Sequence, residues 1–214
     1  MLFLRDDRGS SAAEFALILP IFLLFLLGLI DVGRFAWSFN ELEKSTQTGA
    51  RWAVATDIIP SGLIDYSFAV SSAVPQGTPV KETEFSAINC IGSGSVATPT
   101  ATCSCAPARS GGSTVCPTGL SLLPGTRGTA AFKLLLARMN QIYPSIQPAN
   151  LVVSYVNSGL GFSGDPNGPD VAPIVTVSVQ NLQFPLLFML GTSVGMPTSR
   201  YSMTLEDGQG TVSN

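Results

Sequence analysis

The chain has no histidine and few charged residues among its 214 positions. Without histidine it lacks the residue that most often performs general acid–base catalysis and most often binds transition metals. Charged residues make up 12% of the sequence and the net charge is −3, so no excess of cations is available for phosphate contacts. We therefore expect no enzymatic activity, no metal, no cofactor and no nucleic-acid partner.

The residues that the chain does have in abundance are apolar residues, Gly and Pro. Hydrophobic residues make up 45% of the sequence, which is enough to fill a core and excludes wholesale disorder. The 21 Gly and 15 Pro predict a loop-rich body with few exposed helices.

The longest apolar run lies near the N-terminus. Residues 15–30, FALILPIFLLFLLGLI, carry no charge, and the run extends back to Ala12 with Glu14 as its only interruption. At about 1.5 Å per residue in a helix, residues 12–30 are about as long as the hydrocarbon core of a bilayer is thick. The sequence therefore predicts one membrane span over about residues 12–30.

A cleaved secretory signal and a plain membrane anchor are the simpler interpretations of this run. A signal requires a small-x-small cleavage site close behind the apolar core, whereas Ala36-Trp37-Ser38 lies beyond Asp31 and Arg34. A plain anchor leaves Glu14 unexplained, because a carboxylate costs about 2.5–3.5 kcal/mol at the bilayer centre and usually has a partner or a function.

Cleavage of the chain between Gly9 and Ser10 would supply a partner for Glu14. The new α-ammonium of Ser10 would lie four residues before the acid, one helical turn away. A short charged leader, a Gly, four small residues, Glu-Phe and an apolar helix interrupted by Pro20 resemble the type IV pilin class, whose leader is removed after Gly.

The phrase GSSAAEFALILP at residues 9–20 is most similar to the TadE-like minor pilins or pseudopilins of the tight-adherence (Tad, Flp) pilus, and Gly28, Asp31 and Gly33-Arg34 extend the match. The resemblance implies that a prepilin peptidase removes residues 1–9 as a cytoplasmic leader. It implies that Glu14 sets the register of assembly with other pilin subunits. It also implies a single-pass protein of the inner membrane with a periplasmic C-terminal domain, an inner-membrane assembly platform as a partner, and a place in an extracellular pilus used in cell adhesion.

Beyond the span we expect the helix to continue, so that one long helix covers residues 10–57. Apolar side chains recur at spacings of three and four residues as far as Ala53, which is the pattern of an amphipathic helix. Pro60 ends it, because proline lacks a backbone donor and disfavours helical geometry in the residue before it.

Residues 58–214 are expected to form an extracytoplasmic domain, and the fold class is α+β: a long N-terminal helix packed on a small antiparallel sheet. Alternating patterns predict an antiparallel pair of strands over 151–157 and 174–181, with further strands over 66–74 and 200–206. A helix is predicted over 129–140, with Thr129 as its cap.

The four cysteines lie in a polar, turn-rich segment that we expect to be a loop over residues 90–116. Cys103 and Cys105 are separated by one residue, which is closer than usual for zinc ligands. Disulfides fit an extracytoplasmic compartment, and a bond between Cys103 and Cys105 would strain their geometry. Two pairings remain: Cys90–Cys103 with Cys105–Cys116, or Cys90–Cys105 with Cys103–Cys116.

Two further segments suggest sites without establishing them. Residues 184–190, FPLLFML, are apolar but too short to span a membrane, and we expect them in the core, or docked on the sheet or the lipid surface. Residues 165–170, DPNGPD, hold carboxylates at a spacing that could suit calcium. Their Pro, Asn and Gly are turn residues, however, and no complete calcium loop is present.

The leading hypothesis is a structural subunit or assembly initiator of a Tad-type pilus. The alternative is a single-span membrane-anchored domain that binds or hydrolyses a ligand outside the cytoplasm. Hydrolysis without histidine would need a Ser-Lys or carboxylate pair, and residues 81–84, KETE, are the only dense group of charges in the body. A solvated loop explains that group better. The new N-terminus distinguishes the two hypotheses, because only the pilin hypothesis predicts Ser10.

Overall fold

A computed structural model describes residues 7–72, 74–166, 169–187 and 192–205. They belong to two compact units. The helix–hairpin unit comprises the chain up to Asn40 together with Gln183–Met196, and the sheet unit comprises Glu41–Leu182 together with the chain from Pro197.

Helix α1 (Asp7–Val54) is 48 residues long and includes Pro20. The prediction of one uninterrupted helix is confirmed, although α1 begins and ends three residues earlier than the predicted bounds of 10 and 57. The positive charge of Arg51 in the last turn stabilises the C-terminal end of α1 through its interaction with the helix dipole. Among the described residues, α1 is the one helix that is long and apolar enough to cross a membrane.

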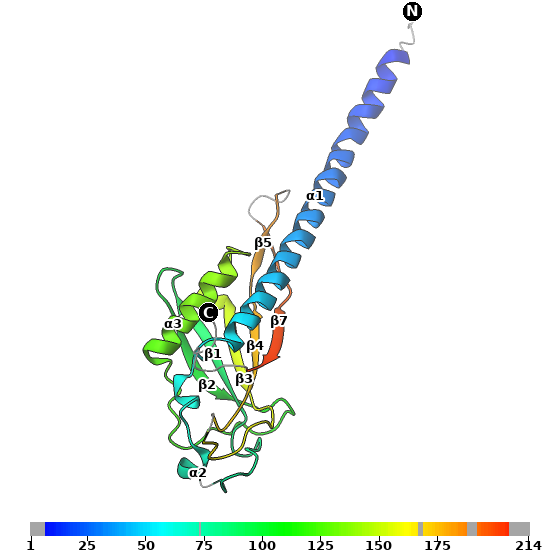
Figure 1. The fold of residues 1–214 in the computed structure, drawn as a ribbon. Coiled ribbons are helices and arrows are strands. Elements are labelled where there is room, and N and C mark those ends of the chain that lie inside the picture. The colour runs from blue at the N-terminus through cyan, green and yellow to red at the C-terminus, as the bar shows by residue number, and fades with distance from the viewer. Residues whose placement is uncertain (1–6, 73, 167–168, 188–191, 206–214) are drawn as a thin grey trace, which may run out of the picture. The chain divides into compact units, whose positions relative to one another are not determined.

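The sheet unit is built on a five-stranded antiparallel sheet with the strand order β2-β1-β3-β4-β7, shown in Figure 1. Its strands are β1 (Ala87–Gly94), β2 (Pro99–Ala106), β3 (Leu151–Val156), β4 (Ile174–Val179) and β7 (Ser199–Thr204). The predicted antiparallel pairing of β3 with β4 is confirmed, in a register that places Leu151 opposite Val179. The α+β class is therefore confirmed as well.

The remaining elements are short, apart from one helix. The sheet unit contains α2 (Phe68–Ser71), α3 (Gly125–Asn140) and the 3₁₀ turns Ser61–Leu63 and Pro148–Asn150. The helix–hairpin unit contains β5 (Gln183–Pro185) and β6 (Ser193–Gly195), which pair with each other in an antiparallel hairpin.

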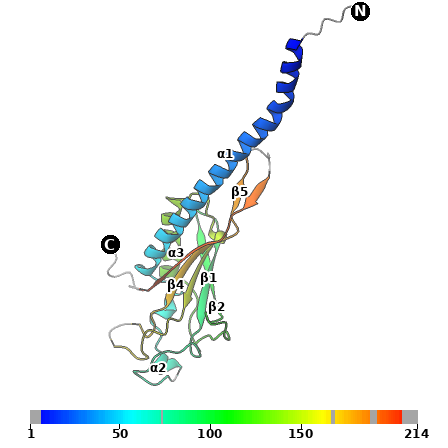
Figure 2. The same cartoon turned by 90° about the vertical axis from the view of Figure 1, so that its right-hand side faces the viewer.

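The core of the sheet unit forms between one face of the sheet and α3. Alternate residues of β4 are buried, and β3 buries Leu151, Val152, Val153 and Tyr155. Helix α3 buries side chains at helical spacing: Ala131, Phe132, Leu135, Leu136 and Met139. The last turns of α1 lie beside α3 (Figures 1 and 2), where the Ser45 hydroxyl donates to the Met139 carbonyl at 3.0 Å. Gly49 permits this approach, because a Cβ there would lie 2.7 Å from the Met139 sulfur.

The predicted strand over residues 66–74 is wrong, because the structure places α2 there. Groups outside the sheet form hydrogen bonds with this segment, in place of a neighbouring strand. The Phe68 backbone N–H donates to the Asp170 carboxylate at 2.7 Å, and the Tyr66 hydroxyl donates to the Thr118 carbonyl at 2.8 Å. Phe68 itself is fully buried.

The predicted cysteine-rich loop over 90–116 is also wrong in part. Cys90 lies in β1, and Cys103 and Cys105 lie in β2, so most of the segment is a β-hairpin. Local composition concealed the strands because β1 is stabilised by a distant neighbour, β3, which pairs with residues 87–91. The disulfides are Cys90–Cys103 and Cys105–Cys116, one of the two pairings left open by the sequence.

The predicted cap of the helix at Thr129 is wrong. Helix α3 begins at Gly125, and the Thr129 hydroxyl donates to the Gly125 carbonyl at 2.6 Å from inside the helix. Gly128 explains why the first turn fits here: a Cβ at this position would lie 2.0 Å from the Ile59 carbonyl oxygen. Close packing of the helix start, and not a side-chain cap, sets this boundary.

Tyr155→Phe should destabilise the sheet unit. Tyr155 is 1% exposed, and its hydroxyl accepts a hydrogen bond at 3.0 Å from the Ile59 backbone N–H, which is also buried. Removing the acceptor leaves that N–H unsatisfied, which should lower the free energy of unfolding by about 1–3 kcal/mol. Thermal unfolding of the detergent-solubilised full chain measures this change. Tyr201→Phe, at a position 38% exposed, is the control and should be close to wild type.

The same substitution should weaken the alkaline sensitivity of the protein. Burial raises the pKa of the Tyr155 hydroxyl above its ordinary 10.0, and the hydrogen bond from Ile59 lowers it only in part. Above that pH the unfolded chain loses the proton and the folded chain keeps it, so stability falls as pH rises. The wild-type melting temperature should therefore fall more steeply above pH 10 than that of Tyr155→Phe; parallel profiles would contradict the assignment.

Single cysteine variants test the disulfide pairing. Cys90→Ser should leave its partner Cys103 as a free thiol, and Cys116→Ser should leave Cys105 free. Alkylation under denaturing, non-reducing conditions followed by fragment mass spectrometry locates the label. A label on Cys105 in the Cys90→Ser protein would establish the other pairing. Loss of either bond should lower the free energy of unfolding by about 2–5 kcal/mol.

Candidate membrane and assembly site

The N-terminal half of α1 presents apolar side chains outward on all sides. Of residues 15–30, those more than half exposed are Phe15, Leu17, Ile18, Ile21, Phe22, Phe25 and Leu29. Exposed apolar surface of this extent marks a site of contact with lipid or with other proteins. Pro20 interrupts the hydrogen bonding of α1 but not its course, as membrane helices tolerate when neighbouring groups satisfy the freed carbonyl.

The proposed processing site lies in the first turns of α1. Gly9 and Ser10 are helical in the intact chain, and the helix continues without a break to Glu14. Ser10 and Glu14 therefore occupy positions i and i+4 of one helix, which places them one turn apart on the same face. The Glu14 side chain is exposed. This geometry is the one that the sequence argument required, while cleavage after Gly9 stays a prediction.

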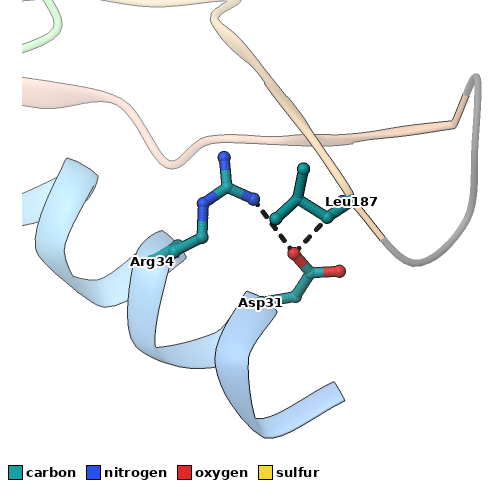
Figure 3. A network of polar contacts seen from close by, with 3 residues as sticks. All are labelled: Asp31, Arg34 and Leu187. Carbon is teal, nitrogen blue, oxygen red and sulfur yellow. Dashed lines mark hydrogen bonds and ion pairs between the residues drawn. The ribbon is translucent and has the colours of Figure 1, made fainter. Parts of the chain in front are cut away.

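Asp31 marks the other end of the apolar run and has a different environment. It is 6% exposed, and its Oδ1 atom accepts two hydrogen bonds, shown in Figure 3. One comes from the Arg34 guanidinium at 3.1 Å and the other from the Leu187 backbone N–H at 3.1 Å. A buried carboxylate is tolerated when it is paired and hydrogen-bonded in this way.

Aromatic contacts complete the attachment of the β5–β6 hairpin to α1. Phe184 of β5 packs edge-to-face against Phe35, with ring centroids 5.5 Å apart, and the Arg34 guanidinium carbon lies 5.2 Å from the centroid of the Phe184 ring. Phe184 is 3% exposed. The structure thus buries the first residue of the apolar segment 184–190 beside α1, and residues 188–190 of that segment lie outside the described part.

The role of Asp31 is one that the sequence argument did not identify. Asp31 and Arg34 stand three residues apart directly after the apolar run, and an acid followed by a base at this spacing on a helix was a signal of a local ion pair. The second partner could not be found in this way, because Leu187 is 156 positions further along the chain.

The other groups considered from the sequence have structural contacts. The Asp170 carboxylate accepts hydrogen bonds from the Phe68 and Asp165 backbone N–H groups, and residues 167–168 of the segment 165–170 lie outside the described part. The charged segment 81–84 closes a surface turn, and Glu82 accepts a hydrogen bond from the Ser110 hydroxyl at 2.7 Å. Across the described ranges, no group of three or more His, Cys, Asp or Glu side chains is placed to hold a metal ion.

Comparison with known protein families matches the segment that holds this site. The family model described as TadE-like protein matches residues 9–51, about a fifth of the chain. No curated protein and no solved structure matches the chain. The matched segment includes Gly9, Glu14, the apolar run and Asp31, and over these residues the chain is similar to TadE-like proteins, as its N-terminal motif had indicated.

Proposed function

We propose that the protein is a minor pilin or assembly initiator of a Tad-type pilus, a structural component and not an enzyme. The observation that carries the proposal is the outward-facing apolar surface of α1, with Glu14 one turn after Ser10, in a segment that matches TadE-like proteins. An exposed apolar helix of this length needs either lipid or other helices around it.

The proposal includes a sequence of locations. A prepilin peptidase removes residues 1–9, α1 anchors the mature chain in the inner membrane, and the sheet unit lies in the periplasm. The two disulfides, Cys90–Cys103 and Cys105–Cys116, support this side, because disulfides persist in oxidising compartments. The assembly platform of the inner membrane then brings the subunit together with other pilin subunits.

Assembly on this proposal is a lateral exchange within the membrane. The apolar side chains of residues 15–30 leave lipid and pack against the helices of neighbouring subunits, which changes the partner but not the polarity of their surroundings. Glu14 supplies register, because a carboxylate in that apolar layer is stable only where a cation or donor meets it. The α-ammonium of Ser10, from the same chain or from a neighbour, is the cation that cleavage creates.

The mature N-terminus tests the processing step. Protein purified from membranes of cells that contain the prepilin peptidase should begin at Ser10 when its N-terminus is sequenced. In cells without the peptidase it should retain residues 1–9. A mature chain that begins after Ala36-Trp37-Ser38 would identify a secretory signal, and an uncut chain in both strains would identify a plain anchor.

Substitution of Glu14 tests the assembly step. Glu14→Ala and Glu14→Gln should insert, be cleaved and fold, since the apolar run is unchanged. Their fraction in sheared pili should fall about tenfold or more, the effect of losing about 1.4 kcal/mol of pairing free energy. Immunoblots of membrane and pilus fractions measure the ratio.

The matched control for this test is Glu43→Gln, an exposed acid of α1 beyond the apolar run. It should enter pili as the wild type does. Comparison of the two Glu14 variants separates charge from shape, because Gln keeps the size and hydrogen bonding of the acid. Wild-type incorporation of both variants would reduce Glu14 to a residue that stabilises the helix N-terminus.

A further inference from the structure

The β5–β6 hairpin runs along α1 toward the apolar run. At its start, Phe184 lies beside Arg34 and Phe35; three residues later, the Leu187 N–H bonds to Asp31. From Phe184 to Leu187 the chain therefore runs toward the N-terminal end of α1. β5 lies alongside α1 in both views (Figures 1 and 2). The hairpin approaches the segment that would lie in the membrane.

The contact with Asp31 fixes how far the hairpin reaches. Asp31 directly follows Ile30, the last residue of the uncharged run, so a span over residues 12–30 leaves the hydrocarbon core at this point. Leu187 is held at the same level by its backbone hydrogen bond, and its side chain is 59% exposed. The exposed side chain of Leu187 thus lies at the level at which the exposed apolar surface of α1 ends.

The surrounding side chains have the composition of a membrane interface. Arg34 lies on the same level, partly exposed and packed over the Phe184 ring, where its guanidinium can reach lipid phosphates while its stem stays on apolar surface. Trp37 is 69% exposed and lies about 9 Å beyond Asp31 along the helix axis at 1.5 Å per residue. Tryptophan is enriched at this depth, among the lipid headgroups.

β5 begins with a polar residue. Gln183 is exposed and accepts a hydrogen bond from the Ser193 hydroxyl at 3.2 Å, across the strand pair. From Gln183 at the start of β5 to Leu187, two residues beyond its end, the exposed side chains therefore change from polar to apolar. This gradient has the direction of the gradient in the bilayer, from water to hydrocarbon.

We propose that the hairpin is a second membrane contact, with Leu187 resting in the headgroup–acyl boundary of the leaflet through which α1 leaves the bilayer. Its partner is the lipid surface. The helix–hairpin unit is then attached at two points, the span and the hairpin, which restrains rotation of α1 about its own axis. The inference rests on α1 as a membrane span and is independent of cleavage after Gly9 and of assembly into a pilus.

Tryptophan fluorescence in brominated lipid tests the contact. The full chain is reconstituted in vesicles of phosphatidylethanolamine and phosphatidylglycerol, with or without bromine on the acyl chains, and the wild-type signal is subtracted. Leu187→Trp should lose emission in brominated vesicles. Gln183→Trp, at the start of β5 and four residues before Leu187, should lose much less. Leu27→Trp within the span gives the full quenching of a position among the acyl chains.

Two comparisons decide the outcome. Asp31→Ala in the Leu187→Trp protein should reduce quenching at 187, because the carboxylate that holds the strand is gone, and should leave quenching at Leu27→Trp unchanged. Quenching at Leu27→Trp without any at Leu187→Trp would overturn the proposal. So would a signal at 187 that changes with the protein-to-lipid ratio, since it would identify a second copy of the chain as the partner.

Discussion

The apolar surface of residues 15–30 is the constraint on which the rest of the protein depends. Its side chains are exposed around the whole helix, and apolar area on this scale is unfavourable in water. Lipid and neighbouring helices both accept it, but each requires that backbone groups bond within the segment. This is the physical reason for a helix that continues through Pro20, and for an acid at each end of the run that needs a partner.

The two acids meet that need in different ways. Asp31 is buried and bonded to Arg34 and Leu187, so its partners belong to the same folded unit. Glu14 lies on the exposed surface of α1, and the α-ammonium of Ser10, which we propose meets it in assembly, would be created by cleavage after Gly9. Asp31 therefore stabilises the helix–hairpin unit, whereas Glu14 is the residue for which we propose a role in assembly.

The sheet unit depends on contacts between distant segments. Its edge strand β2 is linked by Cys90–Cys103 to β1 and by Cys105–Cys116 to the segment that follows β2. Tyr155 of β3 accepts the hydrogen bond of Ile59, just beyond α1, and Ser45 of α1 donates to the end of α3. A domain with few charges, joined in this way by buried hydrogen bonds and disulfides, suits an oxidising compartment.

The sequence by itself determined the features whose signal is local. The apolar run and its helical continuation predicted α1 to within three residues at each end, and alternation predicted the β3–β4 pair. The motif around Glu14 indicated the similarity to TadE-like proteins that the match over residues 9–51 shows. Each signal is complete within a short window, because helix period, strand period and the motif all repeat or end within a few residues.

Only the tertiary structure decided the features that depend on a distant partner. The strands that hold Cys90 and Cys103 form because β3 pairs with β1, and residues 66–74 are not a strand because Asp170 takes the Phe68 N–H. Asp31 accepts a hydrogen bond from the Leu187 backbone N–H, which is 156 positions away in the sequence. Burial and hydrogen bonding between segments override local propensity at these places, and no window of sequence contains both partners.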